Sequence, residues 1–479
     1  MSMIEEILNK IVEWGGNLIL WDYVLIYLLI GAGLFFTLRT KFIQFRLFGE
    51  MFKVIREEAV EQSGKRGTNA FQAFSISIAS RVGTGNLAGV ALAVAIGGPG
   101  AVFWMWVVAL IGMATAFVES TLAQVYKVPD RDGFRGGPAY YMEKALGQKW
   151  MGILFSILIT ITFGFVFNAV QANTISGAVD EAFNVDPIWT GIILVVLAAI
   201  IIFGGIKRIA SIAGVIVPFM AIIYIVVGLY VMITNITALP DVFMMIIKNA
   251  FGLEEAIGGT MGAAMMYGIK RGLFSNEAGM GSAPNAAASA GVNHPVKQGG
   301  LVQSLAVFFD TIVICSITAF IIVLYDGFYQ ASEDGIQLTQ VALSSHVGEW
   351  ASIFVAITIF LFAFSSVIGN YYYGETNIAY LRESKTLLTI YRLIVLAMVM
   401  FGSLASIQIV WSMADLFMAM MAVVNLVAIL FLTKITINVL NDYISQKKEG
   451  KDPVFHYKNI KGLKNVSWWG AQDNQKGTK

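Results

Sequence analysis

The sequence predicts an all-α polytopic membrane protein. Of its 479 residues, 57% are hydrophobic and only 13% are charged, and the mean hydropathy is +0.71, which lies outside the range of soluble domains. Long apolar runs recur from Trp21 almost to Lys434. They do not alternate apolar with polar residues, as the strands of a membrane barrel would. Because lipid offers backbone groups no hydrogen-bond partner, these runs are expected to form helices.

Eleven such runs are long enough to span a bilayer, which takes about 20 residues. We expect the spans at residues 20–38, 70–97, 100–126, 150–178, 187–206, 209–234, 256–275, 300–325, 350–373, 387–406 and 410–434. The first residues, MSMIEEILNKIVEWGG, are acidic rather than basic. They predict a short amphipathic helix at the membrane surface instead of a signal peptide.

Basic residues predict the orientation, because loops rich in Lys and Arg stay on the cytoplasmic side. The 39–69 and 127–149 loops are the most basic. Further basic residues that we place in loops on the same side are Lys207, Arg208, Lys270, Arg271, Arg382 and Lys385. The N-terminus is therefore expected outside the cell membrane and the C-terminus in the cytoplasm, with a solvated basic tail at 441–479.

The order of the spans predicts an internal repeat. Without the helix at 20–38, ten spans divide into two sets of five, and an odd number per half gives the halves opposite orientations, as in inverted-repeat transporters. We therefore divide the chain into an N-terminal segment at 1–69, a first repeat at 70–234, a second repeat at 235–440 and the tail.

Glycine-rich breaks interrupt the first span of each half. One is Gly83-Thr84-Gly85-Asn86, and the other runs from Gly258–Gly262 to Phe274–Gly279. A break frees backbone N–H groups for an anion such as a carboxylate, and carbonyls for a hard cation. Glycines can also serve only for close helix packing, which we favour for Gly97–Gly100 and Gly204-Gly205. In the first break, polar residues between the glycines favour binding of an amino acid and Na+.

Polar side chains in two other spans are further binding candidates. Asn168, Gln171, Asn173 and Thr174 lie in the third span of the first half. Hydrogen bonds between helices would also explain them. Both explanations stay open for Asn173, whereas ligand contact is favoured for Gln171.

In the span at 350–373, the hydroxyls of Ser365 and Ser366 suit a Na+ site without carboxylates. The nearby Tyr371, Tyr372 and Tyr373 are typical of an aromatic belt at the membrane interface.

Ionisable residues at membrane depth are costly and usually functional. The candidates here are Arg81, Glu119, Glu277, Asp310 and Asp415. Each could bind a ligand or join an ion pair that gates the cytoplasmic side, and for Arg81 with one of the acids we favour the ion pair. The three histidines lie outside the expected spans, which argues against a haem or metal site. The formal net charge of +1 gives no sign of nucleic-acid binding.

Two long motifs carry a family resemblance: GTGNLAGVALAVAIGGPGAVFWMW at 83–106 and FSNEAGMGSAPNAAASA at 274–290. They resemble the alanine/glycine:cation symporter family, also called the sodium:alanine symporter family. The resemblance implies a leucine-transporter-type (LeuT) fold, in which one extra helix precedes two inverted five-helix repeats. It also implies coupling to Na+, or to H+ in some members, and substrates such as alanine, glycine or glutamine.

The resemblance also implies site residues. The substrate carboxylate would meet the backbone at Thr84 and Gly85, with side-chain contacts from Gln171, Phe274 and Asn276. By analogy with the wider fold, the cation would be surrounded by Val82, Ser365 and Ser366, and we add Asn86 to that set.

One departure concerns substrate size. Many members have tryptophan before the tyrosine-rich stretch, where this chain has Gly369-Asn370-Tyr371. Asn370 would enlarge the pocket and offer an amide, which favours glutamine.

The sequence thus predicts Na+-coupled symport of a small neutral amino acid by alternating access, with H+-coupled symport as the alternative and Na+ in place of any cofactor. A channel would favour repeated polar faces along a pore, whereas the polar clusters here are isolated. An enzyme would need a base near Ser365 or Ser366, and no histidine is placed to serve. We therefore expect no enzymatic activity.

Overall fold

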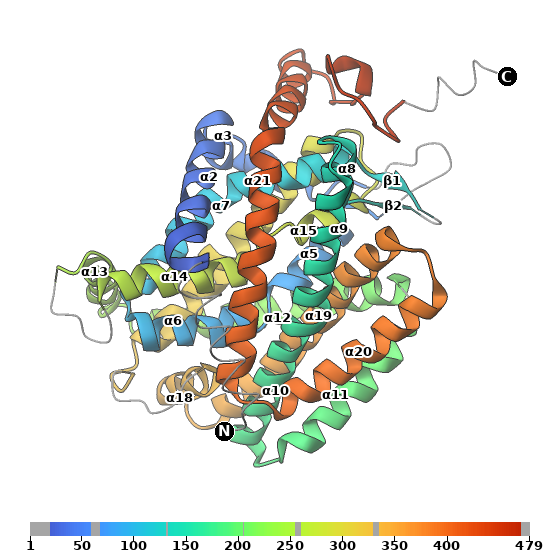
Figure 1. Cartoon of the computed structure of the whole chain (residues 1–479). Coiled ribbons are helices and arrows are strands. Elements are labelled where there is room, and N and C mark those ends of the chain that lie inside the picture. Colours follow the sequence, from blue (N-terminus) through green and yellow to red (C-terminus); the bar gives the residue numbers. More distant parts are fainter. Residues whose placement is uncertain are drawn as a thin grey trace.

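Long helices crossing the molecule dominate the fold (Figure 1). The computed structural model describes residues 20–58, 68–130, 133–204, 206–253, 260–328 and 335–470, and the side chains of 206–218 are outside that description. In these ranges seven helices are long and apolar enough to cross a membrane, or up to nine if each of two bent pairs counts as one span. The prediction of a helical membrane protein is confirmed. The expected N-terminal surface helix and the Gly258-Gly259 pair lie outside the described residues.

The first half of the chain contains two broken or irregular spans and one short hairpin. Its elements are α2 (Ile26–Arg39), α3 (Ile43–Arg46), α4 (Phe48–Val54), α5 (Ala70–Arg81), η2 (Gly85–Gly89), α6 (Val90–Gly97), α7 (Gly100–Val125), β1 (Val128–Pro129), β2 (Phe134–Arg135), α8 (Pro138–Lys144), α9 (Lys149–Ile159), η3 (Thr160–Phe167), α10 (Asn168–Phe183), α11 (Pro187–Ile202) and α12 (Ile206–Thr234). The two strands pair antiparallel. α9, η3 and α10 together form one span.

The second half contains the longest helices. Its elements are α13 (Leu239–Ala250), α14 (Met261–Asn276), α15 (Ala283–Ala288), η4 (Val296–Val302), α16 (Gln303–Val307), η5 (Phe308–Cys315), α17 (Ser316–Val323), α18 (Gly335–Val347), α19 (Trp350–Leu381), α20 (Lys385–Leu404), α21 (Ile407–Lys448) and η6 (Tyr457–Asn459). From η4 to α17 the chain forms one span.

Side-chain caps mark where several helices begin. Asn69 and Gln72 form a capping box at the start of α5, and the Thr260 hydroxyl accepts from the N–H of Ala263 at the start of α14. Such caps satisfy N–H groups that the first helical turn leaves unpaired. Outward-facing apolar side chains, such as Ile193, Val196 and Ile200 on α11, are 51–54% exposed. In a membrane these side chains face lipid rather than water.

Two spans are broken, as the sequence predicts. α5 and α6 meet at an angle of 51° around Gly83 and Thr84. α14 stops at Asn276, and the chain runs without helix until α15 begins at Ala283, with Glu277 held at a φ of 58°. The breaks lie side by side, because the Asn86 Nδ2 atom of the first is 3.1 Å from the Ser275 Oγ atom beside the second.

Two expectations about solvent exposure are wrong. Lys270 and Arg271 lie within α14 and are only 4% and 3% exposed, so they mark no loop. The segment that follows α14 is buried too, since every residue of α15 lies inside the protein. Tyr371, Tyr372 and Tyr373 are buried as well, at most 4% exposed. They pack within the protein and form no interfacial belt.

The C-terminal tail packs against the helix ends instead of lying free in solvent. Phe455, Ile460, Trp468 and Trp469 are each at most 7% exposed. The Trp469 indole N–H donates to the Gln124 carbonyl at 2.9 Å. The tail therefore covers one end of the helix bundle, and the solvated-tail prediction is wrong for this segment.

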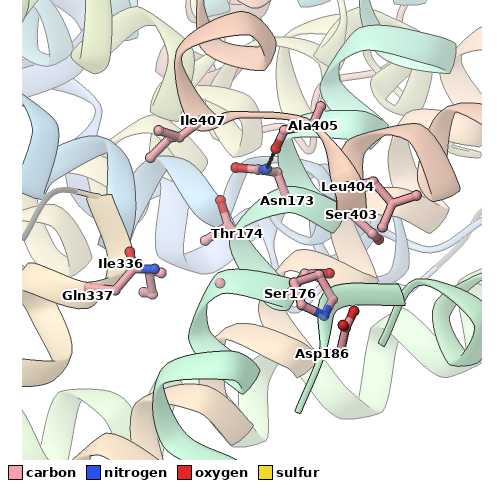
Figure 2. A pocket seen from close by; sticks show the side chains of 12 residues that line it. Asn173, Thr174, Ser176, Asp186, Ile336, Gln337, Ser403, Leu404, Ala405 and Ile407 are labelled. Carbon is pink, nitrogen blue, oxygen red and sulfur yellow. Dashed lines mark hydrogen bonds between the residues drawn. The ribbon is translucent and has the colours of Figure 1, made fainter. Parts of the chain in front are cut away.

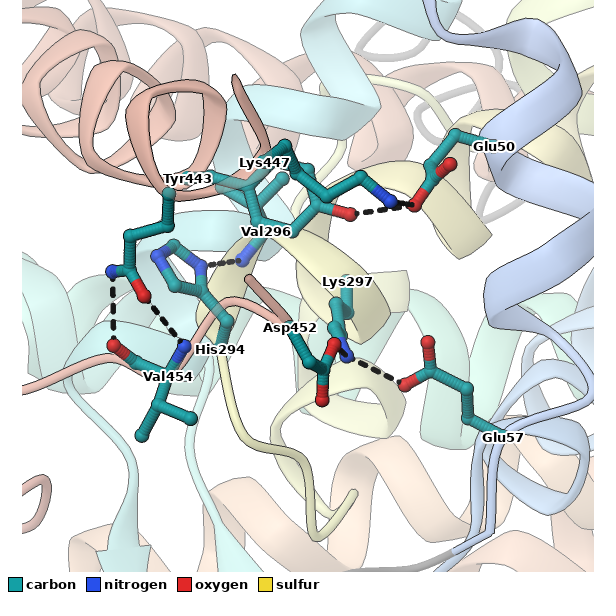
Figure 3. A network of polar contacts seen from close by, with 10 residues as sticks. Glu50, Glu57, His294, Val296, Lys297, Tyr443, Lys447, Asp452 and Val454 are labelled. Atoms are coloured by element: carbon teal, nitrogen blue, oxygen red, sulfur yellow. Dashed lines mark hydrogen bonds and ion pairs between the residues drawn. The ribbon is translucent and has the colours of Figure 1, made fainter. Parts of the chain in front are cut away.

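Ion pairs join the tail to two other segments at the same end of the helix bundle (Figure 3). Lys297 at the start of η4 contacts Asp452 of the tail at 2.7 Å and Glu57 after α4 at 3.0 Å. Nearby, buried His294 lies 3.2 Å from Asp442 of α21. Segments from both ends of the chain therefore meet at the same end of the bundle.

Candidate functional site

The first break is held open by side chains from two other helices. The Thr84 N–H donates to Gln171 Oε1 of α10 at 3.0 Å, and the Gly83 N–H donates to Asn86 Oδ1 at 2.9 Å. A Cβ atom on Gly83 would lie 2.3 Å from Ser366 Oγ of α19 and 2.9 Å from Gln171 Oε1. Only glycine leaves room for this approach.

Four of the six predicted substrate residues come together at this break. Gly85 sits against Phe274, because a Cβ on Gly85 would meet the Phe274 ring at 3.0 Å. Thr84 and Gln171 join through the hydrogen bond above. Phe274 itself lies between two aromatic rings, with centroid distances of 4.5 Å to Phe167 and 4.7 Å to Trp411. Sequence reasoning missed these two flanking rings.

Of the other two predicted substrate residues, Asn276 lies at the second break, and Asn370 of α19 lies beside Ser80 at the end of α5. The Asn276 Oδ1 atom accepts from the Ala278 N–H at 2.9 Å, and Asn370 Oδ1 lies 3.1 Å from Ser80 Oγ. Within the described chain, neither amide nitrogen has a hydrogen-bond partner, and the Thr84 hydroxyl has none either. All three residues are at most 1% exposed. Buried polar groups are rarely left without a partner, so these groups mark places for a polar ligand or water.

The two serines of α19 form an oxygen cluster with the end of α5. Ser366 Oγ lies 2.9 Å from the Ala79 carbonyl and 3.3 Å from the Val82 carbonyl. Ser365 Oγ lies 3.4 Å from the same Ala79 carbonyl. These four oxygens are the kind of ligand that a hard cation prefers. Val82, Ser365 and Ser366 of the predicted cation set are thus together, and Ala79 is a member that the sequence did not indicate.

Asn86 belongs to a different polar cluster. Its Nδ2 atom donates to Asp310 Oδ1 at 2.7 Å, and Asp310 Oδ2 accepts from Ser275 at 2.6 Å and from Thr311 at 2.9 Å. The chain's one cysteine, Cys315, is buried beside them, with its sulfur 3.1 Å from Ser275 Oγ. The structure therefore divides the predicted cation set into two groups.

Arg81 is the residue for which the sequence predicts an ion pair with a buried acid. In the described part of the chain no carboxylate lies within ion-pair distance of its guanidinium, which reaches only the Gln303 carbonyl at 3.4 Å. The nearby acids are satisfied by neutral groups. Glu119 accepts from Asn425 at 2.7 Å and from the Gly279 N–H.

Glu277 is likewise held by hydroxyls, from Ser80 at 2.8 Å and Ser282 at 2.6 Å. Among the described residues Arg81 therefore lies near these acids without a direct ion-pair contact, and its predicted pairing with one of them stays a prediction.

A buried ion pair does exist, between Arg271 of α14 and Asp415 of α21. One guanidinium nitrogen lies 2.6 Å and 2.8 Å from the two Asp415 oxygens. The guanidinium also stacks over the Trp411 ring, 4.4 Å from its centroid, a cation–π contact. The carbonyl of Asp415 accepts from the Trp21 indole at 3.1 Å. The sequence signal for Arg271 was its position one helical turn before Phe274, on the same face.

The polar residues of α10 have different roles. Gln171 contacts the break, whereas Asn173 donates to the Gly402 and Ala405 carbonyls at 3.0 Å and 2.7 Å. Asn168 donates to the Gly164 carbonyl within its own span. Bonding between helices therefore accounts for the Asn173 amide nitrogen.

Comparison with protein families decides the class to which this site belongs. The model of the sodium:alanine symporter family matches residues 5–457. The chain belongs to this family. It is thus a membrane transport protein and not an enzyme, and the family resemblance seen in the two glycine-rich motifs is confirmed.

Relatives with established names support the same assignment. The chain is 59% identical to the amino-acid carrier protein AlsT of Bacillus subtilis, across 97% of this chain and 98% of the relative. It is 54% identical to the probable sodium/glutamine symporter GlnT of the same organism, across 99% of both. It is 37% identical to the sodium/alanine symporter AgcS of Methanococcus maripaludis, across 88% of this chain and 94% of the relative.

Solved structures share the arrangement of helices at much lower identity. A manganese transporter of Eremococcus coleocola aligns with 79% of this chain and 86% of its own at a TM-score of 0.54 and 14% identity. A Na+-coupled sialic acid symporter aligns with 95% of this chain and 94% of its own at 0.51 and 15%. These likenesses concern the fold alone.

Proposed function

We propose that this symporter couples the uptake of a small neutral amino acid, with alanine, glycine and glutamine as candidates, to the inward movement of Na+. The observation that carries the proposal is the break at Gly83–Asn86, which Gln171 contacts from one helix and Ser366 from another. Irregular backbone inside a membrane protein is tolerated where it lines a binding site. Here it lies between amide, hydroxyl and aromatic groups.

The substrate would bind with its carboxylate at the break. Backbone N–H groups near Thr84 and Gly85 begin the half-helix η2–α6, whose positive dipole end favours an anion. Gln171 positions this backbone, and Phe274 with its two ring neighbours shields the bound carboxylate from water. The free amide nitrogen of Asn276 would take part at the second break, and that of Asn370 beside the end of α5. Asn370 suits the side-chain amide of glutamine, and one relative is named a probable sodium/glutamine symporter.

Na+, as the co-transported ion, would bind between α5 and α19. Its ligands would be the carbonyls of Ala79 and Val82 and the hydroxyls of Ser365 and Ser366. This set has no carboxylate, so its affinity depends on the spacing of the two helices. Movement of α19 relative to α5 would therefore release the ion.

We further propose a LeuT-type fold with alternating access. The inverted repeats would be residues 70–234 and 235–440, preceded by 1–69 and followed by the tail at 441–479. The Arg271–Asp415 pair, stacked on Trp411, would be the gate on the side opposite the tail. The protein would lie in the cell membrane with its N-terminus outside and its C-terminus in the cytoplasm, so that this gate faces outward.

Coupling to H+ is the alternative, and the buried acids favour it. Glu119, Glu277 and Asp310 are buried near the breaks, and among the described residues none of them makes a direct ion pair, although Arg81 is close enough to interact with all three. One relative, 38% identical, is named a sodium/proton-dependent alanine carrier protein, and another, 46% identical, carries the same name with the word putative. A proton bound to one of these acids would replace or accompany Na+.

Uptake by proteoliposomes tests the proposal. Labelled alanine, glycine and glutamine are each supplied under an inward Na+ gradient, an inward H+ gradient, or neither. Na+-driven accumulation above the outside concentration supports symport, and H+-driven accumulation supports the alternative. Equilibration without accumulation would indicate a channel. Absence of any uptake from folded protein would refute the proposal.

A further inference from the structure

A cavity separate from the central break lies at the end of the bundle opposite the C-terminal tail. Its volume is about 350 Å³, within the range of pockets that bind small molecules. It opens between α10, the start of α11, α18 and the α20–α21 link (Figures 1 and 2). The lining residues used in the argument are Asn173, Ser176, Gly177, Asp186, Gln337 and Ile407.

The polar lining of this cavity is rich in acceptors. Ser176 is only 1% exposed, and its hydroxyl has no partner within the described chain. Asn173 uses its amide nitrogen to bind the α20–α21 link, and its amide oxygen points away from that bond (Figure 2). Asp186 adds a carboxylate at the rim, and none of the lining residues is Lys or Arg. Such a lining favours a ligand with a positively charged donor, such as an ammonium group.

The apolar lining limits the size of the ligand. Pro187, Ile336, Leu404 and Ile407 supply the remaining surface. A small aliphatic body with an ammonium group would bury its carbon atoms against them, while the ammonium group donates to Ser176, Asn173 and Asp186. A neutral amino acid has such an ammonium group and aliphatic body, and its carboxylate would be placed toward the amide nitrogen of Gln337, a donor in the same lining.

The cavity is lined by α10, the helix whose Gln171 contacts the central break. Thr174 and Gly177 follow Gln171 by three and six residues on α10, which corresponds to about 5 and 9 Å along the helix axis. A molecule held here would be one or two helical turns from Gln171. The cavity is therefore adjacent to the central site and distinct from it.

We propose that this cavity is an outer binding site that holds the ammonium group of the amino acid before it reaches the central site. The inference rests on the proposed function and adds a second station on the substrate's path. The Asp186 carboxylate at the rim attracts the ammonium group, and the Ser176 hydroxyl oxygen accepts a hydrogen bond from it inside the cavity.

Two variants test the cavity without altering the central site. Asp186→Asn removes the charge but keeps the cap of α11, because an Asn oxygen can still accept from the Ile188 N–H, now at 2.9 Å. Gly177→Leu fills the cavity. Its Cβ would lie 2.9 Å from the end of the flexible Gln337 side chain and at an ordinary contact distance of 3.9 Å from Ile336. Gly31→Leu on α2 is the matched control, since nothing lies within 4 Å of that position.

Uptake kinetics give the first readout. We expect Asp186→Asn and Gly177→Leu each to raise the KM for the amino acid at least fivefold, with a maximal rate within twofold of wild type. Half-saturation by Na+ should be unchanged, and Gly31→Leu should match wild type. If both folded variants keep the wild-type KM, the outer site is refuted. If they shift only the Na+ half-saturation, the cavity attracts the cation and the proposal for the amino acid is refuted.

Equilibrium binding gives the second readout. Labelled substrate titrated onto purified wild-type protein at saturating Na+ should bind in two phases, and onto Gly177→Leu in one. A single phase in both would refute the outer site. Failure of wild type to accumulate any amino acid would instead refute the proposed function, and the outer substrate site with it.

Discussion

The side-chain oxygen of Gln171 accepts a hydrogen bond from the Thr84 N–H at 3.0 Å, which fixes the position of the broken backbone relative to α10. An amide side chain in an apolar helix thus replaces the helical partner that this N–H has lost. A ligand carboxylate would meet a backbone that is already positioned. Such preorganisation lowers the cost of binding.

Replacing Gln171 with Met should therefore weaken substrate binding. Met keeps the length of the side chain but leaves a buried N–H unsatisfied, at a cost of about 1–3 kcal/mol. We expect the dissociation constant for the substrate to rise at least fivefold in a binding titration. Thr433→Val is the control, because that hydroxyl bonds only to carbonyls of its own helix. Equal affinities for the two variants would contradict the role of Gln171.

The double variant Ser365→Ala, Ser366→Ala should weaken Na+ dependence far more than folding. Both hydroxyls donate to carbonyls of regular helices, at Phe362 and Ala79. Their removal therefore leaves few groups unsatisfied. We expect the Na+ concentration for half-maximal uptake to rise at least tenfold. Ser345→Ala on α18 is the control, and an unchanged Na+ half-saturation in well-folded double variant would remove the serines from the cation site.

Breaking the Arg271–Asp415 pair should destabilise the protein. Asp415→Asn leaves a buried guanidinium without its counter-charge, which typically costs about 3–5 kcal/mol. We expect a clear fall in the unfolding temperature of the purified protein. The double variant Arg271→Met, Asp415→Leu removes both charges and should recover most of that loss.

Transport by the same double variant tests the gate. Without the ion pair, the path on that side should close poorly, so the variant should bind substrate but accumulate little against a gradient. Accumulation at the wild-type level would show that the pair stabilises the fold without gating it.

Packing of the tail should weaken in acid through His294. Burial lowers the pKa of His294 from its ordinary 6.5, although Asp442 beside it acts in the opposite direction. Lys297, Asp452 and the rings of Tyr443 and Phe455 are its other neighbours. The pKa of His294 is lower in the packed state than in the unpacked state, so as the pH falls the unpacked state binds the proton first. His294 therefore stabilises the packed tail above pH 6.5, and this stabilisation is lost as the pH falls below that value.

Hydrogen exchange measures this effect. Amides of residues 453–469 should exchange faster at pH 5.5 than at pH 7.5, after correction for intrinsic rates. His294→Gln should show a smaller difference between the two pH values. Slower exchange of these amides at pH 5.5 than at pH 7.5 in wild type would contradict the proposal that protonation of His294 loosens the tail.

The sequence predicted the breaks well, because glycine beside Thr84 and Asn86 has no simple packing explanation in an apolar span. It predicted Gln171 and the two serines for the same reason, since each is a polar exception to an apolar pattern. Arg271 and Lys270 were wrongly placed in a loop, because a charge buried against Asp415 and Trp411 looks the same in sequence as a charge in a loop.

Partners that come from distant helices were not predictable from the sequence. Trp411 is one of ten tryptophans, and nothing local indicates that it stacks on Phe274. The tail was misjudged because its many charges conceal four apolar side chains that pack together only when the chain folds back. Arg81 was assigned an acidic partner on the cost of burial alone, whereas the acids around it are satisfied by amides and hydroxyls.

Cys315 has a practical consequence. It is the chain's one cysteine, and it is buried next to Ser275 between the two breaks. A cysteine introduced at the surface would therefore be the only thiol that a membrane-impermeant reagent reaches, with no need to remove others first. Pairs of spin labels or dyes across the Arg271–Asp415 gate would report its opening directly. The native thiol itself would become reactive only in a conformation that admits water to the centre of the protein.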